Sequence, residues 1–379
     1  MQRPVLLKTE WTDPLTGCKG YFVIDCLIDG ICGGGIRMRK GLDVNEVERL
    51  AQIMTYKLIG LGIPCGGAKG GIDFDPSHEE SRGVLKRFLE AHKPFLKECW
   101  GTSEDLGTRE EDIMQLLAEM GLNTSVHSFL AKQENPNDVK QGLLKALSSK
   151  VDGMLITDVV TGYGLAQATV AALKAMDMEP SGCTAAVQGF GSVGGSGAYY
   201  LQRNQLKVVA VADAQGTIYC PEGLDVKLLI KKRNHRGEIN REGLPGKYQY
   251  LDRDEWLKLP VDVLVPAAIA DAINEDNVRE IKARLVVEGA NIPTTSGAEE
   301  NLLQRGVPVV PDFVANAGGA GLFGAVLFHR IYDSQGVLEY LNKQISDFTE
   351  AIFLEAKKAN VSLRKAAAQL VEQKLPLNS

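Results

Sequence analysis

The stretch "CTAAVQGFGSVGGSGAYYL", residues 183–201, decides the fold of the second half of the chain. Its apolar segment "AAVQ" is typical of a buried strand, and "SGAYYLQR" beyond it predicts a helix. The turn between them has the pattern G-x-G-x-x-G, in which glycine permits a tight turn, close approach of backbone N–H groups to a pyrophosphate, and close packing of helix on strand. We therefore expect a dinucleotide site formed by Gly189, Phe190, Gly191, Ser192, Val193 and Gly194. The alternative is a glycine-rich turn in a similar fold that binds no nucleotide.

The next apolar run, "KVVAVAD", ends in Asp213, 19 residues after Gly194 (213 minus 194). This is the usual distance to a carboxylate that accepts a hydrogen bond from a ribose 2′-hydroxyl. A carboxylate at that place would repel a 2′-phosphate, so Asp213 favours NAD over NADP as the cofactor.

Further valine-rich runs follow: "VDVLVPA", "ARLVVEGAN" and "VPVVPDFV". Such runs lack polar alternation and suit parallel strands covered on both faces. Each ends in a turn of small or polar residues, and these turns should meet at the carboxyl edge of one sheet, where open α/β folds bind ligands. We predict a Rossmann-like dinucleotide-binding domain over residues 151–339.

The first part of the chain has a different pattern. Segments such as "GYFVIDCLIDG" precede two well-marked helices, which predicts a separate α+β domain over residues 1–150. The polar stretch "AKQENPNDVKQG" at 131–142 is the expected boundary, and helices over about 340–379 are expected to pack back across both domains. The fold class is therefore α/β, with two domains facing a cleft.

Composition narrows the choice of partners. The net charge is −6 and no long basic stripe occurs, which argues against nucleic acid and anionic membranes. The densest basic run, "KKRNHR" at 231–236, is interpreted as a solvated helix end. Without a signal-peptide core or an apolar run of 18 residues, the sequence predicts a cytoplasmic protein. Seven cysteines without a CxxC pair and five histidines without metal-ligand spacing predict neither a disulfide framework nor a metal site.

Lys69 lies in "IPCGGAKGGIDF", residues 63–74, among four glycines, and its immediate surroundings "CGGAKGGI" supply no counter-charge. Such a backbone can fold tightly round a ligand. A partly desolvated lysine has its charged form disfavoured, so its pKa falls toward the range useful for acid–base chemistry. The alternative is a structural lysine in a glycine-rich turn.

Lys57 and Asp105 have simpler explanations when taken alone. Lys57 falls in the last turn of a helix that Asp43 and Glu46 start as a capping box, where a cation complements the helix dipole. Asp105 precedes a helix for which Thr108 and Glu111 form a capping box, where an acid helps the dipole.

The order of these pieces resembles the amino-acid dehydrogenase family that includes glutamate, leucine, phenylalanine and valine dehydrogenases. The resemblance runs from "GGGIRM" at 33–38 through "ANAGG" at 315–319, by way of "MTYK", "GGAKGG", "EDLGT", "TGYG", "VQGFGSVG", "VEGAN" and "VPDFVANAGG". It implies a substrate and oligomerisation domain, a dinucleotide domain, and reversible oxidative deamination of an L-amino acid to its 2-oxo acid and ammonia.

By position, the resemblance implies roles for single residues. Lys57 would bind the substrate α-carboxylate, Lys69 would polarise the carbonyl or activate water, and Asp105 would exchange protons with the amino group. Asn291 and Asn316 would hold the nicotinamide ribose and the substrate. The remaining expected contacts are Thr161 and Ala268 to the cofactor, and Gly33, Gly34 and Phe323 to the substrate.

The same resemblance bears on the substrate. Glutamate-specific members carry a lysine directly before "GG[LV]R" and a serine seven residues after the asparagine of "NAGG", and here Gly33 and Phe323 stand at those places. A buried γ-carboxylate without partners is costly. The sequence therefore favours a branched-chain or aromatic amino acid, with glutamate as the alternative, since much of the dinucleotide half is closer to glutamate dehydrogenases.

Two further expectations concern other classes and the assembly. A non-catalytic NAD-binding regulatory protein is the alternative of another class, although the presence of Lys57, Lys69 and Asp105 together argues against it. The family assembles through its N-terminal domain, and "GYFVIDCLI" offers an edge strand, so we expect a homo-oligomer.

Overall fold

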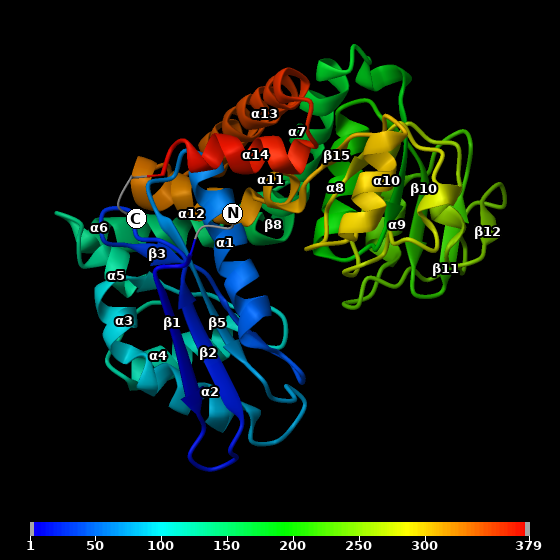
Figure 1. Cartoon of the computed structure of the whole chain (residues 1–379). Coiled ribbons are helices and arrows are strands. Elements are labelled where there is room, and N and C mark those ends of the chain that lie inside the picture. The colour runs from blue at the N-terminus through cyan, green and yellow to red at the C-terminus, as the bar shows by residue number, and fades with distance from the viewer. Residues whose placement is uncertain (1–3, 376–379) are drawn as a thin grey trace. The chain divides into compact units, whose positions relative to one another are not determined.

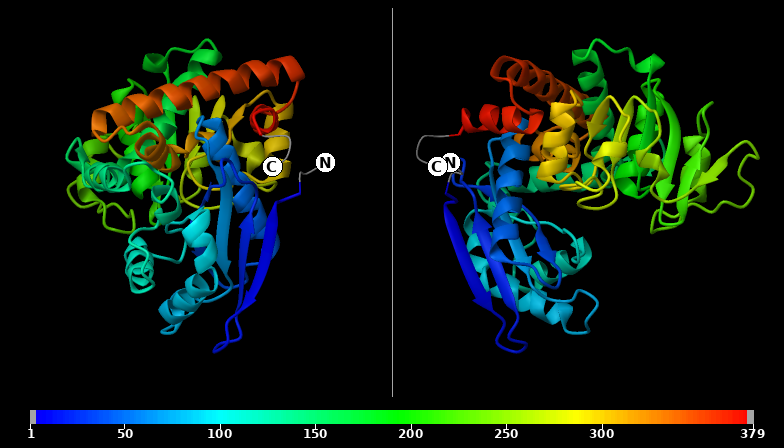
Figure 2. Two further views of the ribbon diagram at one scale, coloured as in Figure 1. Left: turned by 90° about the vertical axis from the view of Figure 1, so that its left-hand side faces the viewer. Right: turned by 45° about the vertical axis from the view of Figure 1, so that its right-hand side comes forward.

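The computed structural model describes residues 4–375 and divides into two compact units. The first comprises the described residues up to Leu143 together with those from Val371, and the second comprises Leu144–Leu370. The predicted boundary after residue 150 thus lies seven residues beyond the observed division (150 minus 143). Each unit has its own sheet and core (Figures 1 and 2).

The first unit is an α+β fold around a six-stranded sheet of order β1-β2-β5-β3-β6, with β4 paired to β5. Its strands are β1 (Leu7–Thr12), β2 (Lys19–Ile24), β3 (Cys32–Gly33), β4 (Ile36–Met38), β5 (Gly66–Ile72) and β6 (Trp100–Gly101). Its helices are α1 (Val44–Gly60), α2 (Ser81–Ala91), α3 (Lys93–Glu98), α4 (Glu110–Glu119), α5 (His127–Leu130) and α6 (Pro136–Leu147), the last of which crosses the division.

The edge strand of this sheet is β1, not the segment predicted from "GYFVIDCLI". That segment forms β2, which is paired on one side with β1 and on the other with β5. The burial of Phe22 and Val23, both at 0% exposure, explains why β2 lies inside the sheet rather than at its edge. On the core side, Phe22 packs against Trp100 with ring centroids 4.3 Å apart.

Helix α1 and strand β5 lie in direct contact, and glycine makes this possible. A Cβ atom on Gly67 would lie 2.2 Å from the carbonyl oxygen of Ala51 and 2.3 Å from the backbone nitrogen of Thr55, both on α1. A Cβ on Gly71 would lie 2.3 Å from a methyl group of Val47. Gly67 and Gly71 therefore serve strand-to-helix packing, and all four glycines around Lys69 belong to a buried strand rather than to a turn folded round a ligand.

The second unit contains the predicted parallel sheet, of order β12-β11-β10-β9-β13-β14-β15. The strands from β10 to β15 in this order pair in parallel, and β11 and β12 add an antiparallel edge. These strands are β9 (Thr184–Gln188), β10 (Lys207–Asp213), β11 (Gly216–Tyr219), β12 (Gln249–Leu251), β13 (Val263–Pro266), β14 (Leu285–Val287) and β15 (Val309–Val310). Strands β10, β13 and β14 are buried almost throughout, as expected of parallel strands covered on both faces.

Helices and a small hairpin complete the second unit. The hairpin consists of β7 (Lys150–Val151) and β8 (Met154–Leu155). The helices are α7 (Ile156–Ala175), α8 (Ser192–Arg203), α9 (Val226–Lys232), α10 (Ser296–Gln304), α11 (Asp312–Ala315), α12 (Gly318–His329), α13 (Ser334–Ala359) and α14 (Leu363–Glu372), with 3-10 turns η1 (Pro180–Gly182), η2 (Glu255–Leu257) and η3 (Val278–Glu280).

The C-terminal helices lie mainly in the second unit, although the end of α14 from Val371 groups with the first. Helix α13 packs against α7, α11 and α12, all in the second unit (Figure 1). Helix α7 is buried on nearly every side, so it supplies the apolar surface that α13 covers. Residues up to Leu370 therefore group with the dinucleotide half.

Candidate active site

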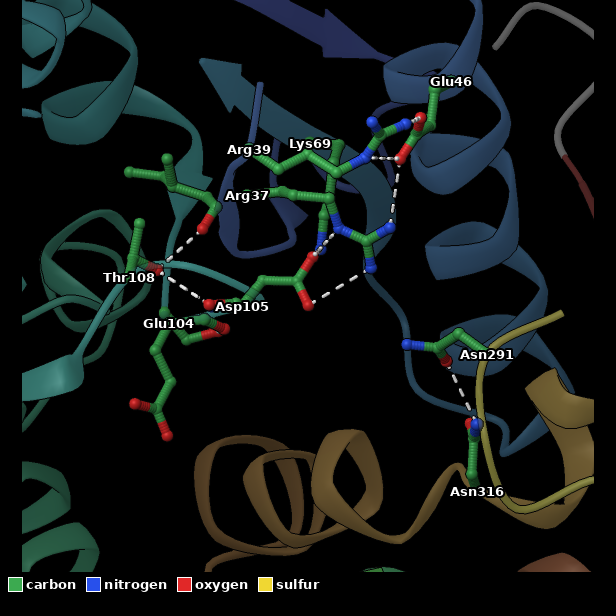
Figure 3. A network of polar contacts seen from close by, with 11 residues as sticks. Arg37, Arg39, Glu46, Lys69, Glu104, Asp105, Thr108, Asn291 and Asn316 are labelled. Carbon is green, nitrogen blue, oxygen red and sulfur yellow. Dashed lines mark hydrogen bonds and ion pairs between the residues drawn. The ribbon is translucent and has the colours of Figure 1, made fainter. Parts of the chain in front are cut away.

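Lys69 is the central residue of strand β5 and its side chain is buried, with 6% of the residue exposed. Its backbone is fixed by pairing with Val23 of β2. The Nζ atom lies 2.8 Å from Oδ2 of Asp105, so the sequence-predicted pair is in direct contact (Figure 3). The counter-charge that the local sequence lacks thus comes from a loop distant in the chain.

Asp105 lies in the loop between β6 and α4, ahead of the helix as predicted. Thr108 holds this loop: its Oγ1 donates to the carbonyl of Ile36 at 2.7 Å and accepts from the Asp105 backbone N–H at 3.0 Å. The predicted capping box of Thr108 and Glu111 is wrong, since α4 begins at Glu110 after an N-cap at Arg109. The hydroxyl is used to fix the Asp105 loop instead.

Arg37 was not singled out from the sequence, although it lies at the centre of the network in Figure 3. Its Nε donates to Oδ2 of Asp105 at 2.9 Å, and its Nη2 donates to Oδ1 at 3.4 Å. Its Nη1 donates to Oε1 of Glu46 at 3.2 Å. Arg39 also pairs with Glu46. The available signal was an arginine in "GGGIR" followed by an acid in the first turn of the next helix.

Of the two side chains predicted to cap the start of α1, only Asp43 does so. Asp43 accepts a hydrogen bond from the backbone N–H of Glu46 at 2.8 Å, as predicted. The Glu46 carboxylate, however, is occupied by Arg37 and Arg39. It therefore serves the arginines at the start of α1.

Burial and the neighbouring charges determine the pKa shifts of Lys69 and Asp105. Burial lowers the pKa of Lys69, while the Asp105 carboxylate opposes this shift and the Arg37 charge adds to it. For Asp105, burial acts to raise the pKa, but the charges of Lys69 and Arg37 outweigh it and hold the pKa well below its usual range. The arrangement thus pairs a carboxylate that stays ionised with a lysine that gives up its proton more readily than a solvated one.

The other predicted substrate residues of this unit lie on neighbouring elements. Lys57 is half-buried in the last turn of α1, the helix packed on β5. Gly33 pairs with Gly67 of β5, and a Cβ placed on it would lie 3.6 to 3.8 Å from Cys65, Leu58 and Phe129. The surroundings of Gly33 are therefore apolar. Gly34 has no such room, because its Cβ would lie 1.7 Å from the carbonyl oxygen of Ala68.

In the second unit, the glycine-rich turn has the geometry that a pyrophosphate requires. Gly189 has φ of +85°, and a Cβ on Gly194 would lie 1.9 Å from the carbonyl oxygen of Gly189. A Cβ on Gly191 would meet nothing within 4 Å, so the backbone there is open at the N-terminus of α8. Ser192 is exposed at the first position of this helix, Val193 follows half-buried, and Phe190 is buried beneath the turn. These residues fit a dinucleotide.

Asp213 ends β10 as predicted, but its carboxylate is already engaged. It accepts hydrogen bonds from the backbone N–H groups of Gln215 at 2.8 Å and Ile239 at 2.7 Å. Arg241 forms a bidentate ion pair with the Asp213 carboxylate, in which Nη2 lies 2.6 Å from Oδ1 and Nη1 pairs with Oδ2. These contacts hold the pKa of Asp213 below its usual value against the opposing effect of burial.

The basic run at 231–236 is not simply a solvated helix end. Lys231 is exposed, but Arg233 is half-buried and its Nη1 donates to the carbonyl oxygen of Gly191 at 2.7 Å. Beside it is a pocket of about 330 Å³. The pocket is lined by Gln215, Lys232, Asn234, Glu238, Asn240, Arg241 and Glu242. Apart from the density of polar residues, no sequence pattern predicts this pocket.

Asn291 and Asn316 are brought together, as drawn in Figure 3. The Nδ2 of Asn316 donates to Oδ1 of Asn291 at 3.1 Å and to the carbonyl oxygen of Gly289 at 3.2 Å. Asn316 is buried, with 8% exposed, whereas Asn291 is exposed. Within residues 4–375, the buried Oδ1 of Asn316 has no hydrogen-bond partner.

The last predicted residues take separate positions in the second unit. Ala268 is exposed beside Gly189, since a Cβ on that glycine would lie 2.8 Å from the Ala268 methyl group. Thr161 is half-buried on α7, where its hydroxyl lies near Gly319 at the start of α12. Phe323 is half-buried on α12.

Over the described residues 4–375, no group of three or more His, Cys, Asp and Glu side chains is arranged to hold a metal ion. Within the same residues, no helix has both the length and the apolar character needed to cross a membrane.

Comparison with known proteins agrees with both halves of the chain. The family described as Glu/Leu/Phe/Val dehydrogenase, dimerisation domain, matches residues 6–121, and Glutamate/Leucine/Phenylalanine/Valine dehydrogenase matches residues 153–375. The glutamate dehydrogenase of Thermotoga maritima is 34% identical over 353 residues, covering 92% of this chain and 82% of the relative. The NADP-specific glutamate dehydrogenase of a Synechocystis species is 32% identical, covering 83% of this chain and 72% of the relative.

A solved structure extends the likeness to the fold. The hetero-hexameric glutamate dehydrogenase from Thermus thermophilus in its Leu-bound form aligns with a TM-score of 0.75 and 26% identity. The alignment covers 97% of this chain and 87% of that one. With both domain families matched along the sequence and the fold shared, the chain belongs to the Glutamate/Leucine/Phenylalanine/Valine dehydrogenase family and is an amino-acid dehydrogenase, an oxidoreductase acting on CH–NH2 groups.

Proposed function

We propose that the chain catalyses the NAD-dependent, reversible oxidative deamination of an L-amino acid, with Lys69 and Asp105 as its catalytic residues. The contact that carries this proposal is the buried pair itself, with Nζ of Lys69 lying 2.8 Å from Oδ2 of Asp105. A lysine of lowered pKa beside a carboxylate that stays ionised is suited to general acid–base chemistry near neutral pH.

The roles divide as follows. When bound, the nicotinamide would supply the acceptor for the hydride that leaves the substrate α-carbon. Neutral Lys69 removes a proton from the water that attacks the resulting substrate imine, and Asp105 carries protons to and from the nitrogen that leaves as ammonia. Lys57 binds the α-carboxylate. In the second unit, the open turn at Gly191 would hold the pyrophosphate, and Asn291 and Asn316 would hold the nicotinamide ribose and the substrate.

NAD is the proposed cofactor because of the charge around Asp213. The carboxylates of Asp213, Glu238 and Glu242 outnumber the cations of Lys232 and Arg241. Arg241 is committed to Asp213, and Nζ of Lys232 donates to the carbonyl oxygen of Glu242. A 2′-phosphate would add negative charge to this pocket, whereas a ribose hydroxyl would not.

L-Glutamate is the first candidate substrate. The support comes from the curated relatives described above, which are glutamate dehydrogenases at 32 to 34% identity. A γ-carboxylate would then need a cation other than a side chain at position 33.

An apolar amino acid is the second candidate, and the surroundings of Gly33 favour it. The space beside this glycine is bounded by Leu58, Phe129 and Cys65. Leu58 and Phe129 are buried, and burying apolar surface against them favours an apolar side chain by about 25 cal/mol per Å².

The experiment follows oxidation of NADH and of NADPH in the presence of ammonium and a panel of 2-oxo acids. The panel contains 2-oxoglutarate, 4-methyl-2-oxopentanoate, 3-methyl-2-oxobutanoate, phenylpyruvate and indolepyruvate. Preference for 2-oxoglutarate selects the first candidate and preference for the other acids selects the second. Faster turnover with NADPH would refute the cofactor proposal.

The matched variants are Lys69→Ala and Lys86→Ala. Lys86 pairs with Glu119 in an exposed ion pair of the same unit, so its loss should leave turnover unchanged. Lys69→Ala should keep NADH binding but lose turnover by at least about 100-fold. Full turnover by Lys69→Ala would remove the catalytic assignment, and binding of NADH by the native protein without turnover of any acid would favour the non-catalytic class.

Assembly as a homo-oligomer is part of the proposal. The match of residues 6–121 to a dimerisation domain supports it, as does the exposed edge of β1, which pairs with β2 on one side. Light scattering on the purified chain tests it, and a monomer at micromolar concentration would be the contrary result. The cytoplasmic location stays a prediction.

A further inference from the structure

We propose that Arg37 is a positioning residue of the reaction, which fixes the direction of the Asp105 carboxylate and serves as its permanent charge partner while Lys69 gains and loses a proton. The inference rests on the proposed function, in which Lys69 and Asp105 are the catalytic pair. It concerns the first unit alone, where all the residues involved lie.

The geometry gives Arg37 control of the carboxylate plane. Its Nε and the Nζ of Lys69 both lie on Oδ2 of Asp105, at 2.9 and 2.8 Å, while Nη2 reaches Oδ1. A guanidinium is planar and donates in a fixed fork, so two contacts to one carboxylate set its orientation, which a single ammonium contact does not. In Figure 3 the carboxylate faces the edge of the guanidinium.

The Arg37 guanidinium is also fixed on the side away from Asp105. Its third nitrogen, Nη1, donates to Oε1 of Glu46 in the first turn of α1. The Arg37 side chain is 12% exposed, so its rotamers are restricted by packing. Strand β4 and the Asp105 loop are also tied through the hydrogen bond from Thr108 to the carbonyl of Ile36. Both ends of the fork are therefore anchored by neighbouring elements.

The charges explain why a second cation is needed. When Lys69 loses its proton, its contact with Asp105 ceases to be an ion pair, and a buried carboxylate without a cation is costly. Arg37 cannot be deprotonated in a protein, so it keeps Asp105 paired in either state of Lys69. Its positive charge also disfavours the ammonium form of Lys69, in the direction that the lowered pKa of that lysine shows.

Other charged groups face this cluster from the elements packed around it. They are Arg39 directly after β4, Glu46 on α1, Glu104 beside Asp105, and Glu110 on α4. Glu104 and Glu110 bond to each other's backbone N–H groups, and burial raises the pKa of Glu110. Among the residues that the structure describes, Arg37 and Lys69 are the cations that pair with the Asp105 carboxylate.

The test compares Arg37→Met, Arg37→Lys and a matched control, Arg87→Met. Arg87 forms the same kind of fork in the same unit, with Nε 2.6 Å and Nη2 2.9 Å from the two oxygens of buried Asp13. Losing either fork removes a buried arginine–aspartate pair, but only the Arg37 fork touches the catalytic pair. Rates of reductive amination are measured across pH with the 2-oxo acid that the native protein prefers.

For Arg37→Met we expect kcat to fall by at least about 100-fold, with KM for the 2-oxo acid changed by less than about threefold. The acidic limb of the pH profile should move up by about one pH unit or more, because Asp105 loses a cation. Arg37→Lys should restore the position of that limb without restoring the full rate, since it returns the charge but not the fork. Arg87→Met should lower the thermal midpoint and leave the pH profile in place.

A second measurement does not depend on turnover. The rate at which formaldehyde and borohydride methylate Lys69, followed by peptide mass spectrometry across pH, reports its protonation. In Arg37→Met the half-maximal rate should move to higher pH, and in Arg87→Met it should not. If Arg37→Met does not fold, Arg37→Lys with its lowered kcat and native limb carries the test.

The outcomes separate this inference from the proposed function. A native protein that turns over no acid would remove the proposed function, and methylation of Lys69 would still decide whether Arg37 controls its charge. Normal native turnover with an unmoved pH profile and unmoved methylation in Arg37→Met would overturn this inference alone. A raised KM with unchanged kcat would also overturn it, because Arg37 would then bind substrate.

Discussion

Lys69, Asp105 and Arg37 form a cluster with two cations on one carboxylate, and the charges of this cluster shift the pKa values of Lys69 and Asp105. Asp105 raises the pKa of Lys69 while burial and Arg37 lower it. The net direction is downward, so proton release from Lys69 depends on a balance that one substitution can shift.

Asp105→Asn tests this balance. The variant should lose turnover by roughly 100-fold to 10,000-fold, because the amide cannot exchange protons with the substrate nitrogen. It should also lower the pKa of Lys69 further, since its neighbouring anion is gone, and methylation of Lys69 should then reach its half-maximal rate at lower pH. Asp112→Asn, which alters a surface ion pair on α4, is the control and should change neither quantity. An unshifted or upward-shifted methylation curve in Asp105→Asn would contradict the assigned cause.

Single residues also show what the sequence could predict. Lys69 and the glycine-rich turn stood out because each has an unusual local setting, whereas the role of Asp105 came only from the family resemblance. Arg37 did not stand out, since its partner lies 68 residues away, and the Asp213–Arg241 pair likewise depends on residues 28 apart. Contacts between distant segments are fixed by the folded sheet, so local spacing carries little information about them. The family resemblance supplied Lys57, Asn291 and Asn316, for which local patterns gave no separate reason.

At the scale of elements, the close contact of α1 with β5 depends on glycines in β5, which have no side chain. Gly67→Ala should lower the free energy of unfolding by about 1 to 3 kcal/mol, because the new methyl group would collide with backbone atoms of Ala51 and Thr55. Gly83→Ala is the control, since the nearest atoms to its Cβ are the flexible ends of Arg87 and Glu80. Denaturant unfolding of both variants measures the difference. Equal stability of the two would show that α1 shifts on β5 at little cost.

Another element-scale feature is a buried ionic cluster in the second unit. Arg364 of α14 pairs with Glu288, Asp312 and Glu299 at 2.5, 3.1 and 2.7 Å. Asp312 in turn accepts from the backbone N–H of Ile292 at 3.0 Å. The cluster thereby ties the loop after β14, which carries Asn291, to α14.

Glu288 makes the stability of this region depend on pH. Burial raises its pKa from 4.5 to about 7, against the opposing charge of Arg364. The folded form therefore holds this proton more tightly than the unfolded chain, and its contribution to stability is full below pH 4.5 and is lost as pH rises through 7. Glu288→Gln should flatten the fall of the thermal midpoint between pH 4.5 and 7.5, whereas Glu299→Gln should retain it. A native midpoint that rises over this range would contradict the assignment.

The elements themselves could be predicted well where periodicity was strong. Parallel strands β9, β10, β13 and β14 were expected from buried valine-rich runs, and the α1 start was expected from Asp43. The strand β5 was not, because four glycines signal a turn in isolation. Here the contact with α1 overrides local propensity, since only glycine leaves room for the helix. The start of α4 was also missed, because Thr108 bonds to Ile36 rather than to its own helix.

At the scale of the whole molecule, the proposed catalytic pair and the proposed dinucleotide turn lie in separate compact units. Gly191→Ala should fold normally, because its Cβ meets nothing within 4 Å. It should weaken NADH binding by at least about tenfold, since the methyl group would fill the side open to the pyrophosphate. Fluorescence titration with NADH measures this, and methylation of Lys69 should be unchanged. Native NADH affinity in Gly191→Ala would mean that the pyrophosphate lies elsewhere.

Helix α1 connects Glu46 in its first turn to Lys57 in its last, and so sets a fixed spacing in the first unit. Eleven residues of α-helix span roughly 16 Å, and each residue turns the helix by about 100°. Inserting or deleting a single residue between these positions would swing one end out of register, so that either the acid behind Arg37 or the lysine near β5 would face the wrong way. We therefore expect this segment to tolerate exchanges of residue type but not changes in length, because the number of residues in α1 sets the distance and the angle between Glu46 and Lys57.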